Sequence, residues 1–162
     1  IILSVNFRFD KQFSPNLKYP SLNNYLIENS IDLETISPRS LSDSIRIIRN
    51  KKLPDPKMIP NVGSVFKNPL VKTTDHPIDF LAGHRWEQEN NLTKFSAARL
   101  IELIYKDLKM PESLSFYENH SLVLINNDNA TFDEVVHFLN EIKDLVYSRF
   151  NVQLSTEPEI IK

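Results

Sequence analysis

A glycine followed by a serine marks the first place where this sequence suggests chemistry. The run from Asn61 to Pro69 reads NVGSVFKNP and holds Gly63, one of only two glycines among 162 residues. Glycine allows backbone conformations that other residues avoid, and here it would leave the Ser64 hydroxyl exposed on a tight turn. The pattern is not the G-x-S-x-G of a hydrolase nucleophile, and no order of Ser, His and Asp can be defined around it. On residue type alone, a structural turn is the simpler interpretation.

Basic residues gather around this serine in the sequence: Lys51, Lys52, Lys57 and Lys67. They favour a loop that accepts an anion, although lysines in loops are commonly only solvated. Asn68 with Pro69 is, by itself, a common start of a turn.

No metal site is predicted. The sequence has no cysteine, and its histidines, His76, His84, His120 and His137, do not follow the spacing of a zinc-binding motif.

The composition predicts one ordinary soluble globular domain, with 41% hydrophobic and 25% charged residues and a net charge of −2. No basic stripe stands out, so we expect no nucleic-acid partner. No apolar run approaches the roughly 20 residues needed to cross a bilayer, and no signal peptide opens the chain. We therefore expect no membrane association.

The first 60 residues alternate between elements and connections. Residues 1–10 alternate apolar and polar side chains, which predicts a half-buried strand. Residues 11–36 are interpreted mostly as connection, and residues 37–52 as a helix that Ser37 could cap. Three prolines make residues 53–60 an extended loop.

The rest of the chain mixes helices and strands. We expect a loop over residues 69–94, a helix over 96–108 and a buried strand over 121–126. A capping box at Thr131 predicts a helix that runs to about residue 150. Val152 and Leu154 would begin a last strand.

These elements predict an α+β fold: a small two-layer domain in which helices pack on a short mixed or antiparallel sheet. No glycine-rich phosphate loop of the GxGxxG or Walker type is present. Because the chain begins inside a predicted strand and without Met, we expect a piece of a longer protein.

Several longer sequence motifs resemble those of one protein family. KKLPDPKMIPNVGSVFKNP, SAARLIE, LVLINNDNATFDEVV and the final EPEI occur in this order. Together they are similar to the signature of UDP-N-acetylenolpyruvoylglucosamine reductase (MurB), a flavoenzyme of bacterial peptidoglycan precursor synthesis. The resemblance spans nearly the whole chain.

The resemblance implies a C-terminal substrate-binding domain in residues 21–162, preceded in residues 1–20 by the last strand and exit of an FAD-binding domain. In this family NADPH reduces FAD, and the flavin passes hydride to UDP-N-acetylglucosamine enolpyruvate to give UDP-N-acetylmuramate. The family also implies a monomer in the bacterial cytoplasm. The flavin-binding residues would lie upstream, so this chain alone should be inactive.

The resemblance also implies site residues. Ser64 is similar to the serine that protonates the carbon next to the carboxylate, and Gly63 would permit the turn that aims it. Glu159 matches a glutamate that helps to stabilise the enol intermediate, which it could do only in its protonated form.

Lys52 and Asn68 match residues that contact the diphosphate side of the substrate. Trp86 and its loop would close over the uridine, for which the family often uses a tyrosine, although a hydrophobic loop anchor is the simpler interpretation. His120 stands near the position of an expected glutamine in the substrate site.

Two departures leave a second hypothesis open. The family's S-A-G-W-L-I becomes residues 96–101, SAARLI, which lack the glycine and the tryptophan. Residues 107–121 contain no glycine where the family is rich in glycine and alanine. The alternative is a catalytically inactive domain that binds a nucleotide sugar or another protein.

Overall fold

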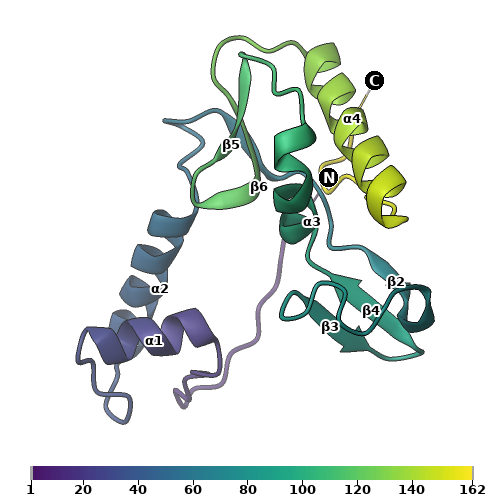
Figure 1. Cartoon of the computed structure of the whole chain (residues 1–162). Coiled ribbons are helices and arrows are strands. Elements are labelled where there is room, and N and C mark those ends of the chain that lie inside the picture. Colours follow the sequence, from purple (N-terminus) through teal and green to yellow (C-terminus); the bar gives the residue numbers. More distant parts are fainter. Residues whose placement is uncertain (1, 162) are drawn as a thin grey trace. The chain divides into compact units, whose positions relative to one another are not determined.

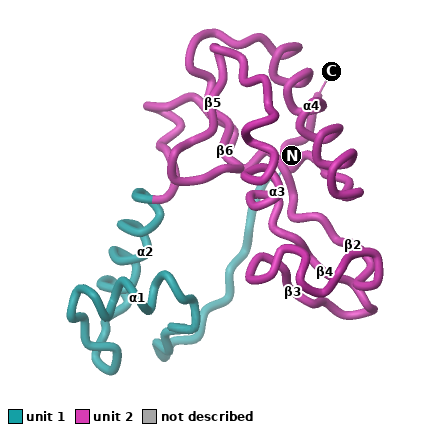
Figure 2. Tube along the Cα trace, viewed as in Figure 1, with its two compact units in different colours: residues 1–51 teal, residues 52–162 magenta. Residues whose placement is uncertain are grey.

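The computed structural model describes residues 2–161, which fall into two compact units divided between Lys51 and Lys52 (Figures 1 and 2).

The first unit holds two helices, α1 (Pro20–Glu28) and α2 (Pro38–Lys52), the second of which ends on the first residue of the other unit. The prediction that residues 11–36 are mostly connection missed the helix α1, which takes nine residues of this range. Pro20 starts α1 because its missing N–H is not needed in the first turn. Leu22 and Leu26, four residues apart, form a small core with Ile36.

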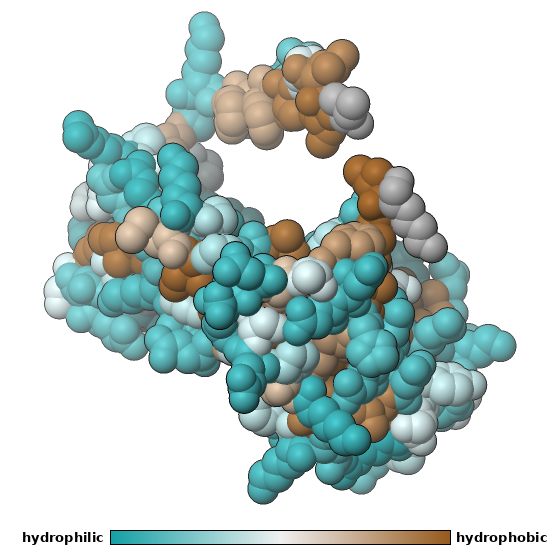
Figure 3. All heavy atoms as spheres, turned by 90° about the horizontal axis from the view of Figure 1, so that it is seen from above, coloured by the Kyte–Doolittle hydropathy of each residue, from teal (hydrophilic) through white to brown (hydrophobic). Residues whose placement is uncertain are grey.

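The strand predicted for residues 1–10 does not form in the described part, residues 2–10. Its apolar side chains at Leu3, Val5, Phe7 and Phe9 are exposed. A strand is stabilised by pairing with a neighbour, and residues 2–10 pair with no strand among the described residues. Apolar residues also reach the surface elsewhere, as the space-filling view shows for one face (Figure 3).

The second unit is built around an antiparallel sheet in the order β1 (Asn61–Ser64), β6 (His120–Asn126) and β5 (Leu114–Tyr117). Helices α3 (Ala97–Ile104) and α4 (Phe132–Phe150) pack with this sheet around one apolar core. The buried residues of the core come from α3, α4, β5, β6 and the two residues after β1: Val65, Phe66, Leu100, Ile104, Leu114, Leu122, Leu124, Phe138 and Ile142. These elements confirm the α+β prediction, with antiparallel pairing throughout.

A second antiparallel sheet lies where a loop was predicted for residues 69–94. Its order is β2 (Leu70–Lys72), β4 (Leu92–Phe95) and β3 (Arg85–Gln88). The strands were missed because each is only three or four residues long, too short to show a period. Asn90 and Asn91 both have positive φ and turn β3 into β4, which is a role that asparagine tolerates.

Helix boundaries follow their capping residues. Thr131 and Glu134 form the predicted capping box of α4, and Asn151 ends this helix in the left-handed conformation. Ser37 accepts a hydrogen bond from the Ser40 backbone, as its predicted capping role requires.

The strand predicted after α4 is not present. Val152 and Leu154 are buried without belonging to a strand, and Thr156 forms an isolated bridge with Phe66. Among the described residues, no helix is long and apolar enough to span a membrane.

Candidate functional site

The backbone around Gly63 is a β-bulge. Asn61 pairs with Ile125 and Ser64 pairs with Val123, so three steps along β1 match two along β6. Gly63 takes φ +77° and its N–H donates to Asn61 Oδ1 at 2.9 Å. A left-handed residue at a bulge is easiest for glycine. The special backbone conformation predicted at Gly63 is thus present, but inside a strand and not on a free turn.

Ser64 ends β1 and is half-buried. It directly precedes Val65 and Phe66, which are both buried in the main core. The backbone of this segment is held by the buried side chains of Val65 and Phe66 and by the hydrogen bond from the Val65 N–H to the Leu122 carbonyl at 2.9 Å. The packing of these neighbours therefore fixes the backbone that carries Ser64.

The chain that carries Glu159 runs beside the chain that carries Ser64. The Lys67 N–H donates to the Ser155 carbonyl at 2.9 Å, and the Glu157 N–H donates to the Val65 carbonyl at 3.0 Å. The bridge itself ends there, because the chain bends at Glu157 and Pro158. Glu159 itself is exposed, so its carboxyl group is open to solvent and not enclosed.

Asn68 has a structural contact in this chain. Its Oδ1 accepts a hydrogen bond from the Ala97 N–H, at the first residue of α3, at 2.9 Å. The adjacent Ser96 hydroxyl caps the same helix through the Arg99 N–H. Since only its oxygen is used in this contact, the exposed Asn68 amide nitrogen is left available to donate to a ligand.

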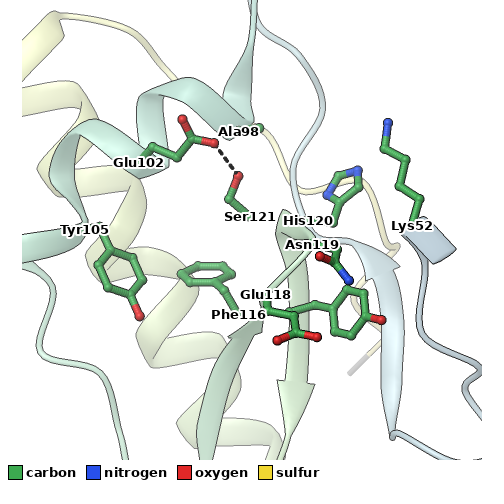
Figure 4. Close-up of a pocket in the computed structure, with 10 residues that line it drawn as sticks. Lys52, Ala98, Glu102, Tyr105, Phe116, Glu118, Asn119, His120 and Ser121 are labelled. Atoms are coloured by element: carbon green, nitrogen blue, oxygen red, sulfur yellow. Dashed lines mark hydrogen bonds between the residues drawn. The ribbon is translucent and has the colours of Figure 1, made fainter. Parts of the chain in front are cut away.

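A pocket of about 500 Å³ opens between α3 and the β5–β6 hairpin. Lys52 and His120, both predicted substrate contacts, lie side by side at one end of this pocket, with Tyr105 and Phe116 at the other end (Figure 4). Ser64, Asn68 and Trp86 do not line it. The structure therefore joins two of the predicted residues in a pocket and places the others elsewhere in the same unit.

Burial lowers the pKa of His120, and the nearby positive charge of Lys52 lowers it further. His120 Nδ1 accepts a hydrogen bond from the Leu122 N–H at 3.2 Å, which places the proton of a neutral ring on Nε2. Next to the ammonium group, this imidazole supplies a neutral hydrogen-bond donor. A lysine with such a donor suits a polar or anionic group.

A carboxylate also borders this pocket and was not predicted. Glu102 accepts from the Ser121 hydroxyl at 3.0 Å and from Arg99 Nη1 at 3.0 Å. Arg99 occupies the place of the tryptophan in the family's motif, so here a polar network stands where that motif has an aromatic ring. Arg99 in SAARLIE was the residue from which this network with Glu102 could have been predicted.

Trp86 lies in β3 and is 48% exposed. Its partner across the ladder is Lys94 in β4, so the two side chains share one face of the second sheet. Lys94 was missed because this region was interpreted as a loop, in which no cross-strand neighbour can be assigned.

Comparison with known proteins gives a consistent result. The model of the family described as UDP-N-acetylenolpyruvoylglucosamine reductase, C-terminal domain, matches residues 55–161. Relatives named UDP-N-acetylenolpyruvoylglucosamine reductase are 35% identical in Neisseria gonorrhoeae, 34% in Buchnera aphidicola and 32% in Escherichia coli O157:H7.

These matches cover 98%, 99% and 98% of this chain, but only 46%, 44% and 45% of the respective relatives. The chain thus spans less than half the length of these proteins. It belongs to the UDP-N-acetylenolpyruvoylglucosamine reductase family, and residues 55–161 correspond to the C-terminal domain of that family.

Proposed function

We propose that this chain is the substrate-binding and proton-donating part of a reductase that converts UDP-N-acetylglucosamine enolpyruvate to UDP-N-acetylmuramate. The observation that carries the proposal is the backbone pairing of residues 65–67 with residues 155–157. This pairing supports a common site for Ser64 and Glu159, which are far apart in the sequence. The enzyme would work as a monomer in the bacterial cytoplasm.

The cofactors of the family, FAD and NADPH, would be held mainly by another part of a longer protein. The residues of this chain do not fit a dinucleotide cradle, because its two glycines are isolated at Gly63 and Gly83 and neither opens a helix. Residues 1–20 would belong to the flavin domain and residues 21–162 to the substrate domain. The cofactors would supply the hydride; this chain would supply the proton.

The proton would come from the Ser64 hydroxyl. Hydride addition at one carbon of the enolpyruvyl double bond places negative charge on the neighbouring carbon and on its carboxylate. A serine is a weak acid, but a positioned donor close to a strongly basic carbon can protonate it. Glu159, in its protonated form, would donate a hydrogen bond to the developing enolate.

The nucleotide part of the substrate would contact side chains of several elements. Lys52 would face a phosphate as a point charge, and the Asn68 amide and His120 Nε2 would donate directional hydrogen bonds. Trp86 would offer an aromatic face to the uridine.

An inactive binding domain remains the second candidate, and the polar network around Arg99 favours it. This arginine replaces the aromatic residue of the family's motif and pairs with Glu102 at the rim of the pocket. Such a domain would bind a nucleotide sugar, or another protein, without turnover.

Kinetics of a full-length protein, with the flavin domain present, distinguish the two. The variant Ser64→Ala should lose turnover by roughly 10²–10⁴-fold at saturating NADPH, because a positioned acid contributes that much. The matched control is Ser148→Ala, which removes a hydroxyl bonded only locally to the Leu145 carbonyl on α4. Turnover within about threefold of the parent in Ser64→Ala would refute the proton-donor role, and a parent without turnover would favour the binding domain.

A further inference from the structure

Arg85, the first residue of β3, is a buried charge. Its side chain is only 8% exposed. Its Nη1 donates to the carbonyl oxygens of Pro77 and Ile78 at 2.9 and 3.0 Å, and its Nη2 and Nε donate to Glu87 Oε1 at 2.7 and 3.2 Å. A guanidinium out of contact with water is stable only when its donors find such partners.

The partners of Arg85 are themselves connected. The second oxygen of Glu87 accepts from the Thr93 hydroxyl at 2.8 Å, and the Thr93 and Thr73 hydroxyls lie 3.0 Å apart. The guanidinium also stacks over the Phe95 ring at 5.6 Å from its centroid. Arg85 therefore stands at the centre of a network that includes residues from all three strands or their ends.

The segment around Pro77 and Ile78, to which Arg85 donates hydrogen bonds, also contacts the main core. His76 Nε2 donates to the Phe150 carbonyl, at the last residue of α4, at 2.8 Å. The His76 ring stacks on Phe80 at 5.0 Å and meets Phe95 edge-on at 5.1 Å. These contacts hold residues 76–80 in place. The hydrogen bonds from Arg85 to the Pro77 and Ile78 carbonyls connect β3 to this segment.

Trp86 follows Arg85 and points to the opposite face of the strand. Arg85 and Glu87 face the network, whereas Trp86 faces outward with Lys94. The strand β3 is four residues long and lies at the edge of a three-stranded sheet. Such a short edge strand has little stability of its own, so its location depends on side-chain contacts.

We propose that Arg85 is a positioning residue for Trp86: its guanidinium joins residues 77–78 to β3 and so fixes the tryptophan on the outer face. The inference rests on the proposed function in one respect, that Trp86 contacts the nucleotide part of the substrate.

The chain has a single tryptophan, so fluorescence reports on Trp86 alone. In the 162-residue chain, Arg85→Lys keeps the charge but loses the planar fork that fits two carbonyls and a carboxylate. We expect acrylamide quenching of Trp86 to rise about twofold while far-UV circular dichroism stays unchanged. The matched control is Arg46→Lys, an exposed arginine of α2 paired only with Asp43 at 3.3 Å.

Calorimetric titration with UDP-N-acetylglucosamine enolpyruvate then tests the link to binding. Arg85→Lys should weaken the affinity about tenfold, and the same change in a Trp86→Phe background should have almost no further effect. Equal losses in both backgrounds would overturn the proposal, because Arg85 would then not act through Trp86. If Arg85→Lys fails to fold, Glu87→Gln tests the same network with the guanidinium retained.

The two proposals fail in distinguishable ways. If the parent chain does not bind the substrate but quenching of Trp86 rises in Arg85→Lys, the positioning role stands and the substrate role of Trp86 is wrong. If quenching does not change, the positioning role is wrong, whatever the parent chain binds.

Discussion

Ser64 and Trp86 are both candidate substrate contacts, and they are held in different ways. Ser64 lies on a chain that bonds to β6 on one side and is followed by backbone bonds to residues 155–157. Trp86 lies on the edge strand β3, which pairs with β4 on one side only and carries the side-chain network of Arg85 and Glu87. Backbone pairing is available to any sequence of suitable shape, whereas a side-chain network fails when one member changes. Exposed side chains should therefore tolerate substitution better in the first region than in the second, whereas the first region is sensitive at its buried core positions and at Gly63.

The largest expected effect is on the core below Ser64. Phe66→Ala should lower the free energy of unfolding by about 3–5 kcal/mol, because it removes a fully buried ring and leaves a cavity. Urea denaturation measures this loss. The control is Val62→Ala, an exposed residue of the preceding strand β1, which should change stability by less than about 0.5 kcal/mol. Similar losses for both would mean that this chain segment does not pack as described.

The bulge should be sensitive to its glycine. Gly63→Ala should cost about 1–2 kcal/mol because alanine is strained at φ +77°, whereas the space around its Cβ is open. Gly83→Ala is a matched control with φ +76° and equally open space. We expect equal losses of stability in urea, but reduced turnover of the full-length protein only for Gly63→Ala. Equal turnover in the two variants would show that the bulge at Gly63 does not affect catalysis.

A third variant should weaken both regions together. The α4 helix contributes to the core that contains Phe66, and its last residue, Phe150, binds His76. Thr131→Ala removes its N-terminal cap and should cost about 1 kcal/mol. Thr131→Ser, which keeps the capping hydroxyl, is the control in the same denaturation experiment. A change in acrylamide quenching of Trp86 without a lower free energy of unfolding would contradict this prediction.

The smallest expected effect is a pH dependence confined to the Trp86 region. The hydrogen bond from Arg85, followed by that from Thr93, lowers the pKa of Glu87 below its ordinary value of 4.5. The folded state therefore favours the carboxylate, so this contribution to stability is present above pH 4.5 and is lost as pH falls through the lowered pKa. In Glu87→Gln the dependence should shrink in denaturation curves recorded from pH 6 to about 3.

The control for this titration is Glu28→Gln, at the end of α1 in the other unit. It should leave the slope of stability against pH in the second unit unchanged. A slope in Glu87→Gln that equals that of the parent would show that Glu87 does not contribute.

Much of the α+β framework was predictable because its signals are local. The capping box at Thr131 and the apolar spacing in residues 96–108 and 131–150 correctly indicated the two core helices, although the first ends at Ile104 and is followed by a 3-10 turn over Tyr105–Asp107. Apolar residues 121–126 correctly indicated the central strand. These features depend on neighbours within a few residues, which the sequence states directly.

The second sheet and the missing strands were not predictable for the opposite reason. Residues 70–72 form a strand only because residues 92–95 lie beside them, and a three-residue stretch carries no period. Residues 2–10 have the alternation of a strand but no pairing partner among the described residues. Pairing joins residues that are distant along the chain, so periodicity alone cannot decide it.

The sequence by itself determined the family, the core helices and the need for glycine at position 63, since each of these depends on residue type and local order. Only the tertiary structure decided that Gly63 forms a bulge, that residues 155–157 run beside residues 65–67, and that Arg85 lies buried behind Trp86. The physical reason is that burial and strand pairing depend on contacts between segments that are far apart in the sequence. The local propensities of a segment do not determine with which other segment it pairs.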